Sequence, residues 1–137
     1  MKRLAVLAFV LVGCGTPLTQ RAMGPSFAHV FAGRYAAQQI TVGRTDVTVG
    51  ALNPQASCGR TGTRPEGPGE DWTCTVTYSD GVTSGTQVFE VQVKADGCWK
   101  ADGPPTVQAP LVLDALSGEQ VTNPLAAFDG CLDTGWH

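Results

Sequence analysis

The chain has 137 residues, which is enough for one domain with a substantial hydrophobic core and too few for two such domains. Its formal net charge of −3 argues against nucleic-acid binding, which requires a basic surface. The same acidic balance argues against electrostatic docking on anionic lipid head groups, so attachment to a membrane would need a different anchor.

The beginning of the chain has the organisation of an export signal. Met1-Lys2-Arg3 is basic, residues 4–12 are apolar, and Gly13 stands directly before Cys14. A basic segment, an apolar segment and a small residue at the cut are the parts of a secretory signal peptide. The apolar run is far shorter than the ~20 residues that a helix needs to cross a bilayer, so the sequence predicts no transmembrane helix.

The tetrapeptide Leu11-Val12-Gly13-Cys14 resembles the lipobox of bacterial lipoproteins. The resemblance implies that residues 1–13 are removed and that Cys14, lipidated, holds the protein on the extracytoplasmic side of the cell membrane. An ordinary cleaved signal with a chance cysteine is the alternative. Two or more acyl chains would hold the protein firmly, whereas one chain binds only marginally. The remaining chain has seven basic and twelve acidic residues, a net charge of −5.

Residues 14–25 contain two prolines and no periodic apolar pattern, which predicts a flexible tether between the lipid and the domain. A single globular domain is expected over residues 26–137. Three aromatic residues recur every four positions at its start and predict an amphipathic helix over residues 26–40: Phe27, Phe31 and Tyr35. Ser26 is the predicted N-cap, and Gly43 stands where a C-terminal glycine is expected.

Alternating side chains after the helix predict antiparallel strands. A first strand is expected from Thr45, where Val47 and Val49 alternate with polar residues. The clearest strand covers residues 72–78, in which aromatic, valine and cysteine side chains face one way and threonines face the other. Ser79-Asp80-Gly81 then predicts a turn.

A further strand is expected over residues 87–93, with one apolar face made by Phe89, Val91 and Val93. Asp96-Gly97 predicts a tight reversal into a strand over residues 98–101. The sequence therefore predicts an α+β fold, in which an N-terminal helix packs on a small curved antiparallel sheet of about four strands.

The pattern of alternating residues weakens after Gly103-Pro104-Pro105. Val112 and Leu113 predict a short edge segment. Residues 123–131 predict an irregular tail, which Cys131 would hold to the sheet by a bond to Cys98.

Four cysteines remain besides Cys14, and an even number in a small exported domain predicts two disulfides. Zinc is the alternative, but no pair has C-x2-C spacing, and neither His29 nor His137 has a partner at ligand spacing. Of three possible connectivities we favour the sequential one, because it closes the two shortest loops. Each bond would stabilise the fold by roughly 3–4 kcal/mol. The predicted bonds are Cys58–Cys74 and Cys98–Cys131.

Three short motifs, Ser57-Cys58, Asp71-Trp72-Thr73-Cys74 and Asp96-Gly97-Cys98, are similar to those of small lipoproteins of actinobacteria. The resemblance covers most of residues 26–131. It implies an envelope location and a helix-on-sheet fold, and it assigns no catalytic residue.

The sequence offers few residues for catalysis. A nucleophile needs a base, and the two candidate bases are His29, beside the apolar stripe of the helix, and His137, the last residue. Glu66, Glu70 and Asp71 share a glycine-rich loop but lack the alternating ligands of a calcium loop, which predicts a solvated acidic loop. Two tryptophans are expected in the core, and a third could stack on a sugar or a peptide: Trp72, Trp99 and Trp136.

The sequence thus predicts a non-enzymatic, lipid-anchored envelope protein whose domain binds an unidentified protein or small ligand. No cofactor, metal or nucleic acid is expected. The alternative is an inhibitor or accessory subunit of a secreted or membrane enzyme.

Overall fold

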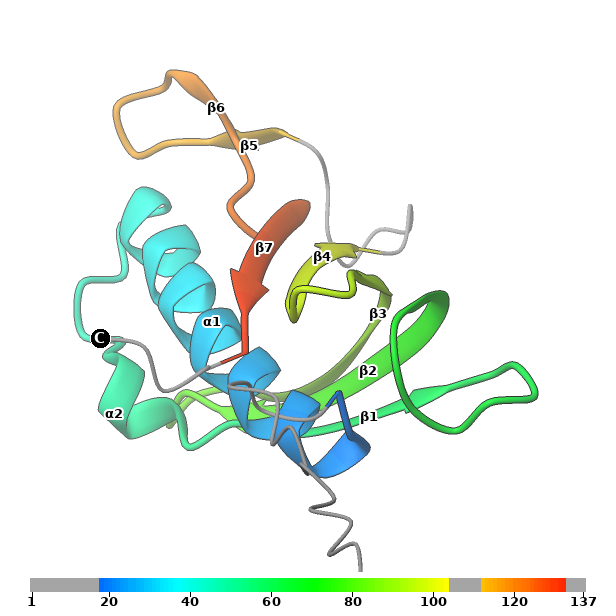
Figure 1. The fold of residues 1–137 in the computed structure, drawn as a ribbon. Helices are drawn as coiled ribbons and strands as arrows, with labels where there is room; N and C mark the ends of the chain where they lie inside the picture. The colour runs from blue at the N-terminus through cyan, green and yellow to red at the C-terminus, as the bar shows by residue number, and fades with distance from the viewer. Residues whose placement is uncertain (1–17, 104–111, 133–137) are drawn as a thin grey trace, which may run out of the picture.

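The structure is a computed structural model, and it describes residues 18–103 and 112–132. The predicted signal peptide, Cys14, Trp136 and His137 lie outside the described residues. The described part contains one long helix and one antiparallel sheet, which confirms the α+β class. Figure 1 shows the helix lying against the sheet, with a small hairpin standing apart beside one helix end.

The helices and strands are α1 (Gln20–Thr41), α2 (Val49–Leu52), β1 (Gln55–Arg60), β2 (Gly69–Ser79), β3 (Ser84–Val93), β4 (Cys98–Asp102), β5 (Val112–Asp114), β6 (Gln120–Thr122) and β7 (Ala127–Cys131). The main sheet has the strand order β1-β2-β3-β4-β7, which is one strand more than predicted. Each neighbouring pair in it is antiparallel. Because α1 contacts both edge strands, the sheet curves around the helix.

Helix α1 begins at Gln20, six residues before the predicted start, so the end of the predicted tether is helical. Thr19, and not Ser26, is the N-cap: its hydroxyl accepts the Ala22 N–H at 3.1 Å. Gly24 and Pro25 disfavour a helix by propensity. Packing overrides that preference, because Gly24 lies so close to β1 that a Cβ there would be 2.7 Å from the carbonyl oxygen of Ala56.

The predicted apolar stripe of α1 is confirmed and begins one turn earlier, with Met23. The helix ends at Thr41. Gly43 follows with φ +100°, the positive φ that is expected of a glycine just past the C-terminal end of a helix. Ser26 has a different role from the predicted one. Its hydroxyl accepts the indole N–H of Trp99 at 3.1 Å and thereby ties α1 to β4.

The prediction of a strand from Thr45 is wrong, because residues Val49–Leu52 form the single-turn helix α2. The Thr48 hydroxyl accepts the Ala51 N–H at 3.3 Å, and this local cap competes with strand formation. Val47 and Leu52 are buried, whereas Val49 is exposed. β1 begins only at Gln55, after the left-handed residue Asn53.

The strands predicted over residues 72–78, 87–93 and 98–101 are confirmed as parts of β2, β3 and β4. The inward face of β3 consists of the predicted apolar residues, Phe89, Val91 and Val93. Trp72 and Trp99 are both in the core, each 1 % exposed. Phe27 of α1 packs between β3, β4 and β7, with ring centroids at 5.3 to 5.5 Å from Phe89, Trp99 and Phe128.

The predicted irregular tail is wrong, since its end is the edge strand β7, paired with β4. Phe128 enters the core, and Gly130 leaves room for Trp99: a Cβ at Gly130 would be 2.6 Å from the indole ring. The predicted edge segment at Val112 is a strand, but it pairs with β6 outside the main sheet. The Leu116 N–H donates to the Thr41 carbonyl at 3.0 Å, which holds this hairpin at the C-terminal end of α1.

Both predicted disulfides are confirmed. Cys58–Cys74 joins β1 to β2, and both residues are buried under the helix. Cys98–Cys131 joins β4 to β7 on the opposite face of the sheet, where Cys131 is exposed. Each bond links residues directly opposite each other, so it ties an edge strand to its neighbour.

Candidate interaction surfaces

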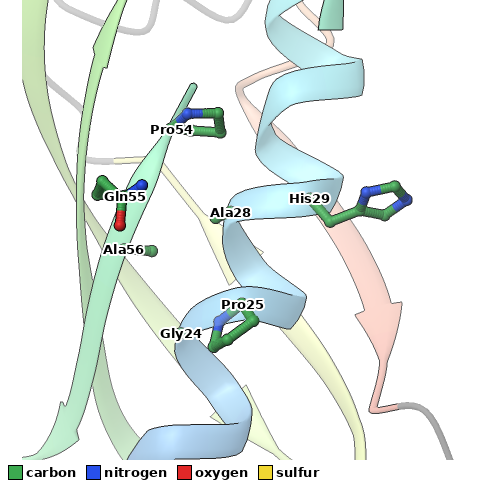
Figure 2. Close-up of a pocket in the computed structure, with 7 residues that line it drawn as sticks. All are labelled: Gly24, Pro25, Ala28, His29, Pro54, Gln55 and Ala56. Carbon is green, nitrogen blue, oxygen red and sulfur yellow. The ribbon is translucent and has the colours of Figure 1, made fainter. Parts of the chain in front are cut away.

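His29 lies on the exposed side of α1, between two shallow cavities. One, about 360 Å³, separates α1 from β1, and the other, about 410 Å³, separates α1 from β7. Figure 2 shows the His29 ring pointing away from β1. The described lining of these cavities contains no carboxylate and no second histidine. The arrangement therefore does not form the base-and-orienter pair that nucleophilic catalysis needs.

The prediction that three acidic residues share one solvated loop is wrong: Glu66 lies in the loop after β1, whereas Glu70 and Asp71 belong to β2, and the three do not converge. Asp71 binds Arg60, with 2.8 Å between the carboxylate and guanidinium, and its other oxygen accepts the Gly62 N–H at 2.8 Å. The hydrogen bond from Arg60 lowers the pKa of Asp71. Glu66 and Glu70 are exposed. Within residues 18–103 and 112–132, no group of three or more potential metal ligands occurs.

The buried carboxylate of Asp80 is a junction that the sequence did not reveal. Its Oδ2 accepts the Tyr35 hydroxyl at 2.7 Å and Nη1 of Arg44 at 2.6 Å, while Oδ1 accepts the N–H groups of Val82 and Thr83. These bonds, the one from Arg44 foremost, lower the pKa of Asp80 well below its usual value. Burial, and then the bond to Asp80, raise the pKa of Tyr35.

Perturbed groups of this kind gather at functional sites, but they also occur in structural networks. Every oxygen of the Asp80 carboxylate already has protein partners, and its side chain is fully buried. The junction therefore has a structural role: it ties the β2–β3 turn to the C-terminal end of α1.

The face of the sheet opposite α1 is polar. Threonines of β2 alternate there with the buried residues, and β3 and β4 add Glu90, Gln92 and Lys100. Val88 is the one large exposed hydrophobic of β3. Among the described residues, the aromatic side chains lie on the helix side, so this face lacks the rings that would stack on a sugar or peptide.

Exposed apolar side chains instead gather at the C-terminal end of α1. We call these side chains together the apolar end; they are Ile40, Val42, Val82 and Leu116, which are 54, 40, 81 and 80 % exposed. A Cβ at Gly43 would lie 3.3 Å from Leu116, so the β5–β6 turn covers the chain next to Val42. Val82 lies in the β2–β3 turn, which the Arg44–Asp80 pair ties to the segment after α1.

The apolar end contains four of the seven large exposed hydrophobic residues of the described chain. None of the four belongs to the periodic patterns that predict the helix and the strands, so periodicity did not reveal them. A signal was nevertheless present, because each of three stands within two residues of a turn glycine: Val42, Val82 and Leu116. A large apolar residue beside such a glycine indicates an exposed turn.

No protein-family model, curated protein or solved structure matches the chain. None of the helices in residues 18–103 and 112–132 is long and apolar enough to cross a membrane.

Proposed function

We propose that this protein is a lipoprotein, anchored through Cys14 on the extracytoplasmic side of the cell membrane, that binds a partner protein with its apolar end. The observation that carries the proposal is the position of the exposed apolar residues. They lie at the C-terminal end of α1, whereas the proposed lipid is attached next to its N-terminal end. A helix of 22 residues separates the two by about 33 Å.

The chemistry of the apolar end favours a protein partner. Leu116 and Val82 project from two different turns, and such groups are costly to leave in water unless something covers them. Exposed carboxylates flank them at Asp46, Asp114 and Glu119. An apolar centre with an acidic rim fits a partner that has an apolar depression bordered by lysine or arginine.

The position of His29 supports a binding role over an enzymatic one. The cavities beside it offer no acid–base partner among the described residues, and the oxidised cysteines are not available as thiolate nucleophiles.

The projecting β5–β6 turn favours a second candidate function. A hairpin that presents an 80 % exposed leucine at its tip can enter the cleft of another protein. The protein would then be an inhibitor or an accessory subunit of a secreted or membrane enzyme. Enzyme assays distinguish the two functions. An inhibitor or accessory subunit changes the turnover of the partner enzyme when the purified protein is added, whereas a simple binding module leaves the turnover unchanged.

The first test concerns the anchor. Cys14→Ser removes the acceptor of the lipid, and we expect the protein to move from the membrane fraction to the soluble extracytoplasmic fraction. Intact-mass measurement of the wild-type protein should show the acyl groups on Cys14. A Cys14→Ser protein that still sediments with membranes would contradict lipid anchoring.

The second test concerns the apolar end. The double change Val82→Ser and Leu116→Ser removes the two most exposed apolar side chains without touching the core. We expect it to abolish copurification of the partner after gentle detergent extraction. Val88→Thr is the matched control, since it changes an exposed valine on the polar face of the sheet. Equal partner recovery from the double variant and the control would contradict the proposed surface.

A further inference from the structure

We infer that the end of the domain around Leu18, opposite the apolar end, rests directly on the lipid head groups. We call it the anchor end; it comprises Leu18, the first turn of α1, residues 60–71 and residues 94–97. The inference depends on the proposed lipidation of Cys14, and it adds a surface of contact and an orientation to that proposal.

The chain between the proposed lipid and the folded domain is short. Leu18 is already part of the fold: its carbonyl accepts the Gly67 N–H at 2.9 Å, and its side chain packs against the core. It also lies beside the 94–97 turn, 3.8 Å from the position of a Cβ at Gly97. Cys14 is four residues before it, and four residues can span at most about 14 Å.

That reach exceeds the thickness of the head-group region of one leaflet, about 5–8 Å, by only a factor of about two to three. The loop around Gly67 and the turn around Gly97 both lie beside Leu18. They must therefore come close to the head groups whenever the lipid is inserted. A tether that ended at residue 25, as the sequence predicts, could extend to about 39 Å and would leave the domain free to stand away.

Charge is distributed unevenly between the anchor end and the rest of the domain. The anchor end has four basic residues, Arg21, Arg60, Arg64 and Lys94, and an equal number of acidic ones. The rest of the described chain has three basic and seven acidic residues. An anionic bilayer repels the acidic rest of the domain but not the anchor end. This difference turns the anchor end toward the lipid and the apolar end away from it.

The kind of exposed side chain at the anchor end also suits contact with lipid head groups. None of the seven large exposed hydrophobic residues in the described chain lies at the anchor end. Arg21, Arg64 and Lys94 are exposed there and can donate to lipid phosphates. These residues suit contact with head groups, without insertion of the domain among the acyl chains.

The experiment compares hydrogen exchange of the acylated full-length protein in vesicles of phosphatidylethanolamine and phosphatidylglycerol with that of a long-tether form. The long-tether form has a Gly/Ser segment of about 20 residues inserted after Gly15, which adds a mean reach of about 25 Å. We expect amides of residues 61–68 and 94–97 to exchange about threefold more slowly in the wild-type form than in the long-tether form. Residues 115–119, in the β5–β6 turn, should exchange equally in both.

Equal exchange of residues 61–68 and 94–97 in the two forms would overturn the inference, and so would slower exchange confined to residues 115–119. Both proteins are first checked for acyl mass on Cys14 and for flotation with the vesicles. A protein without acyl groups on Cys14 would overturn the proposed anchoring together with this inference. A fully acylated protein with equal exchange would overturn the inference alone.

Discussion

The two ends of this domain are held together by different forces. Near the anchor end both disulfides close the sheet, and Arg60–Asp71 holds the loop after β1. At the apolar end the corresponding role falls to the hydrogen bonds that the Asp80 carboxylate accepts from Tyr35 and Arg44. Covalent bonds therefore stabilise the anchor end, and a pH-dependent junction stabilises the end that we propose to bind the partner.

The largest expected effect comes from breaking the covalent side of this comparison. The double change Cys98→Ala and Cys131→Ala should lower the free energy of unfolding by about 3–4 kcal/mol. The reason is that the unfolded chain is then no longer restricted by a cross-link between these two positions. Thermal unfolding followed by circular dichroism measures the change.

In mild reductant the wild-type Cys98–Cys131 bond should open before Cys58–Cys74, whose two cysteines are buried. The opposite order would contradict the placement of the two bonds.

A smaller effect tests the beginning of α1 at the anchor end. Gly24→Ala places a Cβ against the backbone of β1 and should lower the free energy of unfolding by about 2 kcal/mol. Gly33→Ala is the matched control in the same helix, because nothing lies within 4 Å of its Cβ position. The control should raise stability by about 0.5–1 kcal/mol through helix propensity. Similar gains from both changes would mean that Gly24 does not lie against Ala56.

The third prediction concerns the junction at the apolar end. Asp80→Asn should lower the free energy of unfolding by about 2 kcal/mol at neutral pH, since Arg44 loses its buried partner but stays partly exposed to water. Asp46→Asn is the control, because the Asp46 side chain is mostly exposed. Denaturant titration at pH 7 measures both changes, and equal values for the two variants would contradict the junction.

The same variant has a defined pH dependence. The hydrogen bond from Arg44 keeps the pKa of Asp80 low in the folded state, so the unfolded chain takes up a proton first as the pH falls. The stability due to Asp80 is complete above about pH 4, the ordinary pKa of aspartate, and is lost below it. Asp80→Asn should reduce the acid slope of stability, and Asp71, whose pKa is also lowered, accounts for part of the remainder. An unchanged slope would contradict the role of Asp80.

The comparison of the two ends also explains which parts of the fold the sequence could predict. β2 and β3 were predictable because each has many alternating residues with one face in the core. The disulfides were predictable because sequential pairing closes the shortest loops, and the strands place Cys58 opposite Cys74 and Cys98 opposite Cys131. Local periodicity carried enough information in these regions.

The start of α1, the strand β7 and the apolar end depend on contacts between distant residues. In the sequence alone, Gly24 and Pro25 indicate a tether. The structure shows that Gly24 lies against Ala56 of β1, a contact that no local pattern could predict. β7 has only Phe128 and the space at Gly130 to mark its inner face. The exposed valines and Leu116 lie far apart in the sequence, and only the Thr41–Leu116 bond and the Asp80 junction tie their turns to the region around the end of α1.

The most direct test of the two-ended arrangement is photo-crosslinking of the membrane-held protein from two positions, each in its own variant. A photo-reactive residue replaces Leu116 at the apolar end in one variant and Arg64 at the anchor end in another, both with Cys14 intact. We predict a protein adduct from position 116 and a lipid adduct from position 64. Lipid adducts from position 116, or the same protein adduct from both positions, would contradict the account.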